Sequence, residues 1–144
     1  MTYHRQPYSV LVVVYAECGH TLLLERRDLP GFWQSVTGTI ERGETAVAAA
    51  QRELLEETGI EATPVCTGRR RRFKIFDQFL PRFAPGTVSN VESEFVVCLP
   101  ARCKIKLDPA EHTQYRWMTV NEAIAAVGSW TNRAALEALR VAQL

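Results

Sequence analysis

Three glutamates within one helix-forming segment constrain this chain more than any other feature of its sequence. Residues 45–58 are rich in helix formers, begin with a threonine that can cap a helix, and are followed by Gly59, which can end it. Glu53, Glu56 and Glu57 stand at positions i, i+3 and i+4, so a helix would present their carboxylates on one face. At ~6 Å and an effective dielectric constant of about 20, each pair would repel by roughly 3 kcal/mol. A divalent cation bound between them would relieve this repulsion.

The chemistry of this acidic cluster selects the kind of cation. Its groups are all carboxylates, without a thiolate or an imidazole among them. Hard oxygen ligands favour Mg²⁺, or Mn²⁺, over Zn²⁺, and magnesium also binds phosphates. Three glutamates taken alone are more often a solvated acidic face of a helix. The metal interpretation therefore depends on the surrounding sequence.

The spacing around the helix resembles the signature of the Nudix family of hydrolases. Gly38 is followed by five residues, Glu44, seven residues, and then the run Arg-Glu-Leu-Leu-Glu-Glu-Thr-Gly-Ile at 52–60. The resemblance implies an α/β (α+β) fold with a mixed β-sheet between helices. It also implies an enzyme that uses Mg²⁺ or Mn²⁺ to cleave a diphosphate linkage. Arg52 can pair with Glu56 one turn later, so we expect it to orient a carboxylate rather than to touch substrate.

Many Nudix enzymes add a carboxylate from outside the signature, and Glu111 is the candidate here. It lies in a loop just before a predicted strand and could act as a metal ligand or as the general base. An exposed loop glutamate without a function is the alternative. The neighbouring His112 is interpreted as structural or solvent-exposed. The predicted catalytic set, of which the four glutamates would hold the metal, is Arg52, Glu53, Glu56, Glu57 and Glu111.

Periodicity and turn signals place further strands and helices along the chain. Strands, including one short extended piece, are predicted at residues 8–15, 21–24, 33–36, 72–79, 94–99 and 115–118. Helices are predicted at 121–127 and 131–142, capped by Asn121 and Thr131. Strands interleaved with helices indicate a layered α/β architecture. A length of 144 residues without a linker or a repeat indicates one domain over residues 1–144.

The composition excludes several classes of function. Lys and Arg number 17 and Asp and Glu 16, giving a formal net charge of +1, so no overall field attracts nucleic acid or an anionic membrane. The sequence lacks a signal-peptide pattern and an apolar run of membrane-spanning length. A cytoplasmic monomer or homodimer that binds a small triphosphate is therefore expected. The four cysteines form no CxxC pair or Cys/His cluster and are expected to be reduced and mostly structural.

Stretches outside the signature resemble the bacterial dihydroneopterin triphosphate pyrophosphohydrolases, a group within the Nudix family. These stretches are residues 26–28, 32–38, 84–86 and 129–133. The resemblance implies release of pyrophosphate from dihydroneopterin triphosphate, leaving the monophosphate on the way to folate. It implies a metal set of Glu53, Glu57 and Glu111. It further implies that the substrate is contacted by Arg5, Arg26, Thr37, Phe73, Lys74, Ile75, Phe76 and Ser129.

One segment departs from the pattern of the pterin enzymes. The arginine run at 69–72, together with Lys74, is more basic than expected. It would either widen specificity toward other polyphosphates or form a surface loop that only adds solubility. Two other functions stay open: a pyrophosphatase for nucleoside triphosphates that maintains the nucleotide pool, because a pterin resembles guanine in its hydrogen-bonding edge, and a Nudix module that senses a nucleotide without catalysis. The intact glutamates argue against the second.

Overall fold

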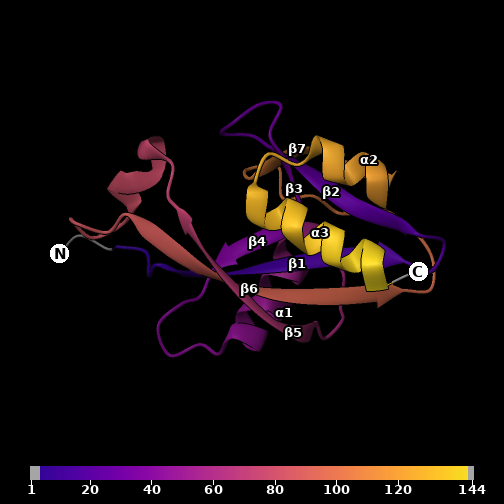
Figure 1. Cartoon of the computed structure of the whole chain (residues 1–144), viewed down its shortest axis with the longest axis horizontal. Coiled ribbons are helices and arrows are strands. Elements are labelled where there is room, and N and C mark those ends of the chain that lie inside the picture. The colour runs from indigo at the N-terminus through magenta and orange to yellow at the C-terminus, as the bar shows by residue number, and fades with distance from the viewer. Residues whose placement is uncertain (1–3, 143–144) are drawn as a thin grey trace.

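The computed structural model describes residues 4–142, which form a seven-stranded sheet with helices packed against it (Figure 1). In chain order the elements are β1 (Tyr8–Ala16), β2 (His20–Arg26), β3 (Trp33–Gln34), β4 (Val36–Thr39), α1 (Ala46–Thr58), β5 (Val65–Lys74), the 3₁₀ helix η1 (Asp77–Arg82), β6 (Ser89–Leu99), β7 (His112–Thr119), α2 (Val120–Ala126) and α3 (Trp130–Ala142). Among these described elements, no helix has the length and apolar character needed to cross a membrane.

β1 is the central strand of a mixed sheet. One edge of β1 pairs in parallel with β6, from Tyr8↔Val91 to Ala16↔Leu99. The other edge is divided, because its first half pairs with β4 and its end pairs with β2, both antiparallel. β2 also pairs with β3 and β7, and β6 pairs with β5. The divided edge brings β4 against α1, the helix that carries the glutamates.

The side chains of β1 alternate between two hydrophobic cores, because successive residues of a strand point to opposite faces. Val10, Val12 and Val14 pack in the core that includes the apolar face of α1. Leu11 and Val13 pack in the core formed with α2 and α3, and Figure 1 shows α3 crossing in front of β1. Burial on both faces explains why this strand is almost continuously apolar. The predicted class, a mixed sheet between helices, is confirmed.

α1 begins and ends as the sequence predicts. The side chain of Thr45 accepts a hydrogen bond from the amide of Ala48, as an N-cap does. Gly59 adopts a left-handed backbone with φ of 77°, and its N–H donates to the carbonyl of Leu55. A residue with a Cβ would be strained in that conformation. Both ends of the helix are therefore fixed by local chemistry.

The predicted strand at 72–79 is wrong in position. The strand of this region is β5, which begins at Val65 and ends at Lys74, and the residues after it form η1 with Pro81 inside the helix. The arginine run at 69–72 thus lies in a strand paired with β6, and not in a surface loop. Charged residues hide the alternation by which strands are recognised, so the sequence gives no signal here. β6 and β7 also begin earlier than predicted.

The two C-terminal helices have other caps than those predicted. Thr119 caps α2 in a capping box with Glu122, so the assignment of the cap to Asn121 is wrong. α3 begins at Trp130, and Thr131 is a buried residue of its first turn rather than its cap. Each predicted helix start is wrong by one or two residues, because several neighbouring polar side chains could each cap the helix.

The cysteines are free, as expected, but the structural role expected of them is wrong. All four lie at the surface: Cys18, Cys66, Cys98 and Cys103. A side chain at the surface adds little to the packing of the core. The hydrophobic cores are built without them.

Candidate active site

The strand β4, which precedes α1 in the chain, meets the helix at Gly38. Gly38 lies in β4 and pairs with Val10 of β1. A Cβ at position 38 would collide with the side chain of Glu53. Glycine is therefore required by close approach rather than by its backbone angles. It allows Glu53 to lie directly against the sheet.

Arg52 connects four groups around the start of the site. Its guanidinium donates to both carboxylate oxygens of Glu44, at 2.8 and 2.9 Å, and to the carbonyl of Thr39 at 3.0 Å. It also donates to Glu53 at 2.8 Å and to Glu56 at 3.4 Å. The predicted pair with Glu56 is present, but the bidentate partner is Glu44, whose pKa these hydrogen bonds lower. Arg52 thus fastens the helix to the preceding loop.

Glu57 is the buried carboxylate of the cluster, and Glu53 is half-buried. Glu57 is 5% exposed, and its Oε2 has no hydrogen-bond partner among the described residues. Burial raises the pKa of Glu57 well above its usual value, and the charges of Glu53 and Glu111 raise it further. Burial raises the pKa of Glu53 to about 7, although Arg52 opposes the rise. A cation close to both groups would favour their ionised forms.

Glu111 and Glu56 are the exposed members of the predicted set. The charge of Glu111 raises the pKa of both Glu53 and Glu57, so it lies within electrostatic reach of them. The side chain of Glu56 is 56% exposed, and its charge acts on the same two groups. Across residues 4–142, no three acidic, His or Cys side chains form a compact ligand cluster. The carboxylates converge on one region, with Glu53 drawn toward Arg52.

His112 adjoins Glu57, and Gln34 adjoins His112; neither residue is among the predicted site residues. His112 is 2% exposed, so the solvent-exposed alternative is wrong. Its Nδ1 lies 3.7 Å from Oε1 of Glu57, and its Nε2 lies 3.4 Å from the amide nitrogen of Gln34. Burial, followed by the charge of Arg26, lowers the pKa of His112 to about 4, so the ring is neutral near pH 7. The sequence signal for it was its place beside Glu111.

Three phenylalanines from different segments form an aromatic cluster. The rings of Phe32 and Phe76 meet edge to face with centroids 5.9 Å apart, and those of Phe76 and Phe79 lie 6.0 Å apart. Phe76 is 47% exposed. Aromatic faces that remain open to solvent can stack on a flat ring. Phe76 was predicted to contact substrate, whereas Phe32 and Phe79 were not assigned.

Arg26, another predicted substrate contact, lies beside this cluster. Its guanidinium lies 4.7 Å from the ring centroid of Phe79, and that of Arg82 lies 4.4 Å from the same centroid. Arg26 also donates two hydrogen bonds of 2.7 Å to Asp28, which Arg82 reaches at 3.2 Å. These contacts, led by that of Arg26, lower the pKa of Asp28 to about 2. A bidentate guanidinium geometry that suits a carboxylate also suits a phosphate.

Two further predicted contacts lie close to these groups. Thr37 stands next to Gly38, its backbone hydrogen-bonds Glu57, and its hydroxyl accepts from Gln34 at 3.2 Å. Ser129 precedes α3 and follows Gly128, where a Cβ would collide with the ring of Phe32. The predicted contacts at Arg26, Thr37, Phe76 and Ser129 therefore border either the carboxylates or the aromatic cluster.

Among the described residues, no hydrogen bond, ion pair or ring contact joins the remaining predicted substrate contacts to the carboxylates or to the aromatic cluster. Ile75 has a buried side chain, and its N–H is bound to the carbonyl of Val88, so a ligand could reach only its backbone carbonyl. Phe73 is half-buried and Lys74 exposed at the end of β5. Arg5 is tied by its backbone N–H to the carbonyl of Arg82, at 2.8 Å.

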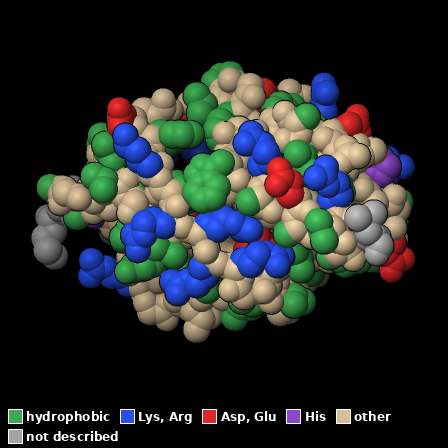
Figure 2. Space-filling model, viewed as in Figure 1, with side chains coloured by type: hydrophobic (Ala, Val, Ile, Leu, Met, Phe, Trp, Pro, Cys, Tyr) green, Lys and Arg blue, Asp and Glu red, His purple; other side chains and the backbone are tan. Residues whose placement is uncertain are grey.

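The basic run of β5 faces a buried carboxylate on β6. Glu94 is 1% exposed and forms ion pairs with Arg69 at 2.7 Å and Arg71 at 2.6 Å. Burial would raise the pKa of Glu94, but the two arginines hold it below its usual value. Figure 2 shows basic side chains gathered over this part of the sheet. Two of the four arginines in the run are thus structural partners, and the interpretation of a merely solubilising loop is wrong.

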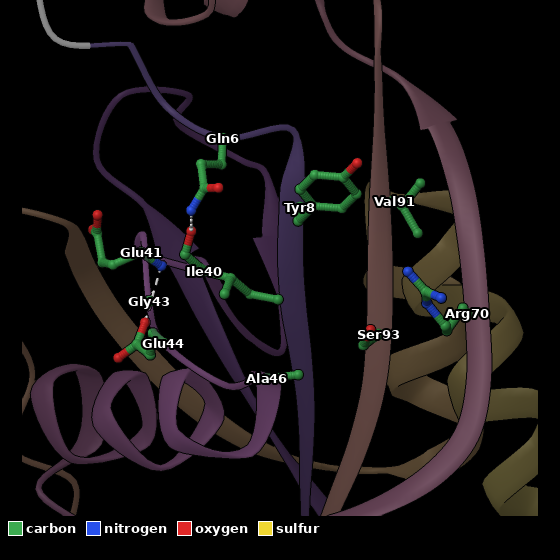
Figure 3. A pocket seen from close by; sticks show the side chains of 10 residues that line it. All are labelled: Gln6, Tyr8, Ile40, Glu41, Gly43, Glu44, Ala46, Arg70, Val91 and Ser93. Carbon is green, nitrogen blue, oxygen red and sulfur yellow. Dashed lines mark hydrogen bonds between the residues drawn. The ribbon is translucent and has the colours of Figure 1, made fainter.

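A hollow of about 340 Å³ opens at the N-terminal end of α1 (Figure 3). Its lining includes Tyr8, Ile40, Glu44, Arg70 and Ser93. None of the predicted metal ligands lines it, so we do not identify it with the catalytic site.

The chain matches known proteins along nearly its whole length. The NUDIX domain matches residues 5–139. The dihydroneopterin triphosphate diphosphatase of Escherichia coli strain K12 is 43% identical over 93% of this chain and 92% of its own. The dihydroneopterin triphosphate diphosphatase of Haemophilus influenzae is 32% identical over 95% of this chain and 89% of its own length. The solved structure of the E. coli dihydroneopterin triphosphate pyrophosphohydrolase has a TM-score of 0.89 at 42% identity, covering 94% of this chain and 96% of that one. Nudix hydrolases act with divalent cations, and this chain belongs to the Nudix hydrolase family.

Proposed function

We propose that this protein hydrolyses dihydroneopterin triphosphate to the monophosphate and pyrophosphate, with Mg²⁺ as its cofactor, in folate biosynthesis. The observation that carries the proposal is the 43% identity to the E. coli diphosphatase over 93% of the chain. Specificity within a fold depends on residues outside the catalytic motif. An identity that extends over both the signature and the segments bordering it therefore supports the substrate as well as the reaction.

The residues present fit a divalent cation. Oε2 of Glu57 is buried and without a partner in the described structure, and Glu53 and Glu111 lie within electrostatic reach of it. The donors are all carboxylate oxygens, as Mg²⁺ prefers. We assign the metal to Glu53, Glu57 and Glu111, with Glu56 at the solvent edge. When bound, the cation would lower the pKa of a water and neutralise charge that develops on the phosphates.

The chain itself orients the reacting groups. Arg52 donates one hydrogen bond of 2.8 Å to Glu53 and two others to Glu44, so it fixes the position of Glu53. Glu111, an exposed carboxylate, is the candidate to accept the proton of the attacking water. The oxygen of that water forms a new bond to phosphorus, the bridging P–O bond breaks, and pyrophosphate leaves with the electron pair of that bond.

The groups that border the carboxylates account for substrate binding in this proposal. Arg26 would exchange Asp28 for a phosphate of the substrate, because both are bidentate acceptors. Phe76, with Phe32 behind it, offers an aromatic face for the flat pterin. Thr37 and Ser129 would add hydrogen bonds.

The test measures products as well as rates. Purified protein is incubated with dihydroneopterin triphosphate and Mg²⁺, and pyrophosphate is resolved from orthophosphate. We expect pyrophosphate, released with a kcat/KM well above that for dGTP or dATP. A clear preference for a nucleotide would keep the Nudix reaction and assign the protein to nucleotide-pool maintenance. Tight binding of either ligand without any phosphate product would instead indicate a sensing module.

A further inference from the structure

Glu57 belongs to a network of four polar residues, each from a different helix or strand. The amide nitrogen of Gln34, in β3, lies 3.2 Å from Oγ1 of Thr37 in β4 and 3.4 Å from Nε2 of His112 in β7. Nδ1 of His112 lies 3.7 Å from Oε1 of Glu57 in α1. The backbone of Thr37 then hydrogen-bonds Glu57. The four residues form a closed ring of contacts.

The direction of these contacts assigns the proton on the imidazole. An amide nitrogen can only donate, so Nε2 of His112 must accept from Gln34. An imidazole ring carries at least one proton, and because Nε2 accepts, that proton resides on Nδ1, the atom that faces Glu57. Turning the amide of Gln34 over would place the proton on Nε2. With Glu57 ionised beside a bound cation, that arrangement would bring the lone pair of Nδ1 against a negative carboxylate in a buried place, which is unfavourable.

We propose that His112 is a positioning residue for Glu57, which donates its Nδ1–H to Oε1 of Glu57 and leaves Oε2 directed to the divalent cation. The inference rests on the proposed metal-dependent function, and it names a second layer of that site. Groups that orient a metal ligand raise its affinity for the ion without touching it.

Two unpaired atoms, one on each residue, support this role, since Nδ1 of His112 faces Oε1 of Glu57 and the other carboxylate oxygen, Oε2, stays free for a ligand. Nδ1 of His112 and Oε2 of Glu57 are the buried side-chain polar atoms without a partner in the described part of the chain. At 3.7 Å the contact is longer than an ordinary hydrogen bond. A small rotation of Glu57 would close it, and a carboxylate held as an anion by a cation is a stronger acceptor than a neutral one.

The first experiment reads the tautomer in the wild-type protein. A long-range ¹H–¹⁵N spectrum of protein labelled at histidine separates Nδ1–H from Nε2–H rings, and a His112 variant identifies its signals among those of the three histidines. We expect the Nδ1–H form at neutral pH in the presence of Mg²⁺. A ring protonated at Nε2 would overturn the inference, and this result would not depend on activity.

The second experiment measures binding of Mn²⁺ from the signal of the free ion in electron paramagnetic resonance. His112→Leu removes the donor and should weaken binding about 10- to 100-fold. His112→Asn keeps an N–H near the position of Nδ1 and should bind close to the wild-type value. His20→Leu, at the start of β2, is the matched control and should change nothing.

These variants separate the two proposals. Unchanged Mn²⁺ affinity in a folded His112→Leu protein would overturn the role of His112, while the wild type would still bind the ion and release pyrophosphate. A wild-type protein that neither binds Mn²⁺ nor releases pyrophosphate would instead overturn the proposed function. If His112→Leu does not fold, Gln34→Leu tests the same ring. It should weaken Mn²⁺ binding and shift the ring toward the Nε2–H form, and an unchanged tautomer and affinity would overturn the inference.

Discussion

Glu57 on α1 and Glu94 on β6 are both buried carboxylates, yet their surroundings shift the pKa of the two groups in opposite directions. Glu94 is 1% exposed and held by Arg69 and Arg71, which keep its pKa below the usual value. Glu57 is 5% exposed, forms no ion pair with Lys or Arg in the described residues, and has a raised pKa. A buried charge must be paired or must coordinate a metal. The fold supplies the partner of Glu94, whereas we propose that the partner of Glu57 is a bound cation.

This difference separates a carboxylate that stabilises the fold from one that we expect to serve the reaction. Removing the charge at Glu57 should harm the reaction and spare the fold, because the fold gains nothing from that charge in the absence of an ion. Disturbing the partners of Glu94 should harm the fold and leave the chemistry of the folded molecules intact. Four substitutions test this contrast, in order of the size of the expected effect.

Glu57→Gln should lower kcat roughly a thousandfold or more, the size of effect that loss of a charge-stabilising group has in phosphoryl transfer. The metal-free variant should melt at the wild-type temperature or above it, because a neutral amide replaces a carboxylate that is costly to ionise. Steady-state kinetics and thermal melting with EDTA measure the two effects. Glu137→Gln, an exposed change in α3, is the control. Near-normal turnover would contradict the metal assignment.

Arg71→Met should destabilise the protein by about 3–5 kcal/mol, because it leaves Glu94 buried with a weaker counter-charge from the half-exposed Arg69. Urea unfolding gives the free energy. The double variant with Glu94→Gln should recover much of the loss, since it removes the unpaired charge. A single variant as stable as the wild type would mean that the ion pair contributes nothing.

Glu92, beside Glu94 on the same strand, tests the comparison through pH. Burial raises its folded-state pKa to about 7 from 4.5, although Thr131 and Arg71 oppose the rise. The folded protein therefore holds the proton more tightly than the unfolded chain. Its contribution to stability is full below pH 4.5 and is lost as the pH rises through 7, up to about 3 kcal/mol. Urea unfolding at pH 5 and 8 should show a loss of stability that is larger in the wild type than in Glu92→Gln by up to about 3 kcal/mol, because Glu53 and Glu57 still contribute a loss in the variant. If the free energy of unfolding depended on pH equally in both proteins, the raised pKa assigned to Glu92 would be refuted.

Glu56→Gln should have the smallest effect, because this carboxylate is half-exposed and its contact with Arg52 is long, at 3.4 Å. We expect less than about 0.5 kcal/mol of lost stability. We expect a much smaller loss of kcat than for Glu57→Gln, measured in the same assay. A loss of kcat equal to that of Glu57→Gln would place Glu56 among the metal ligands of the working enzyme.

The parts of the molecule that were predictable from the sequence are those set by local rules. The ends of α1 follow from a capping threonine and a glycine, and the shared face of Glu53 and Glu57 follows from helical spacing. β5 was misplaced because Arg69 and Arg71 lie in a strand on account of Glu94, a partner 23 or more residues away. His112 was missed because its partners, Gln34 and Glu57, come from other elements. Contacts of this kind depend on tertiary structure, which no local pattern encodes.

The close fit of Gly38 under Glu53 links the alignment of two strands to catalysis. Gly38 stands opposite Val10 in the pairing of β4 with β1, and threonines flank it on both sides. A slip of the pairing by one residue would bring Thr37 or Thr39 beneath Glu53, where a Cβ cannot fit. A misaligned sheet would thus displace the side chain of Glu53, which we propose as a metal ligand, and errors of strand alignment should yield molecules that are inactive as well as poorly packed.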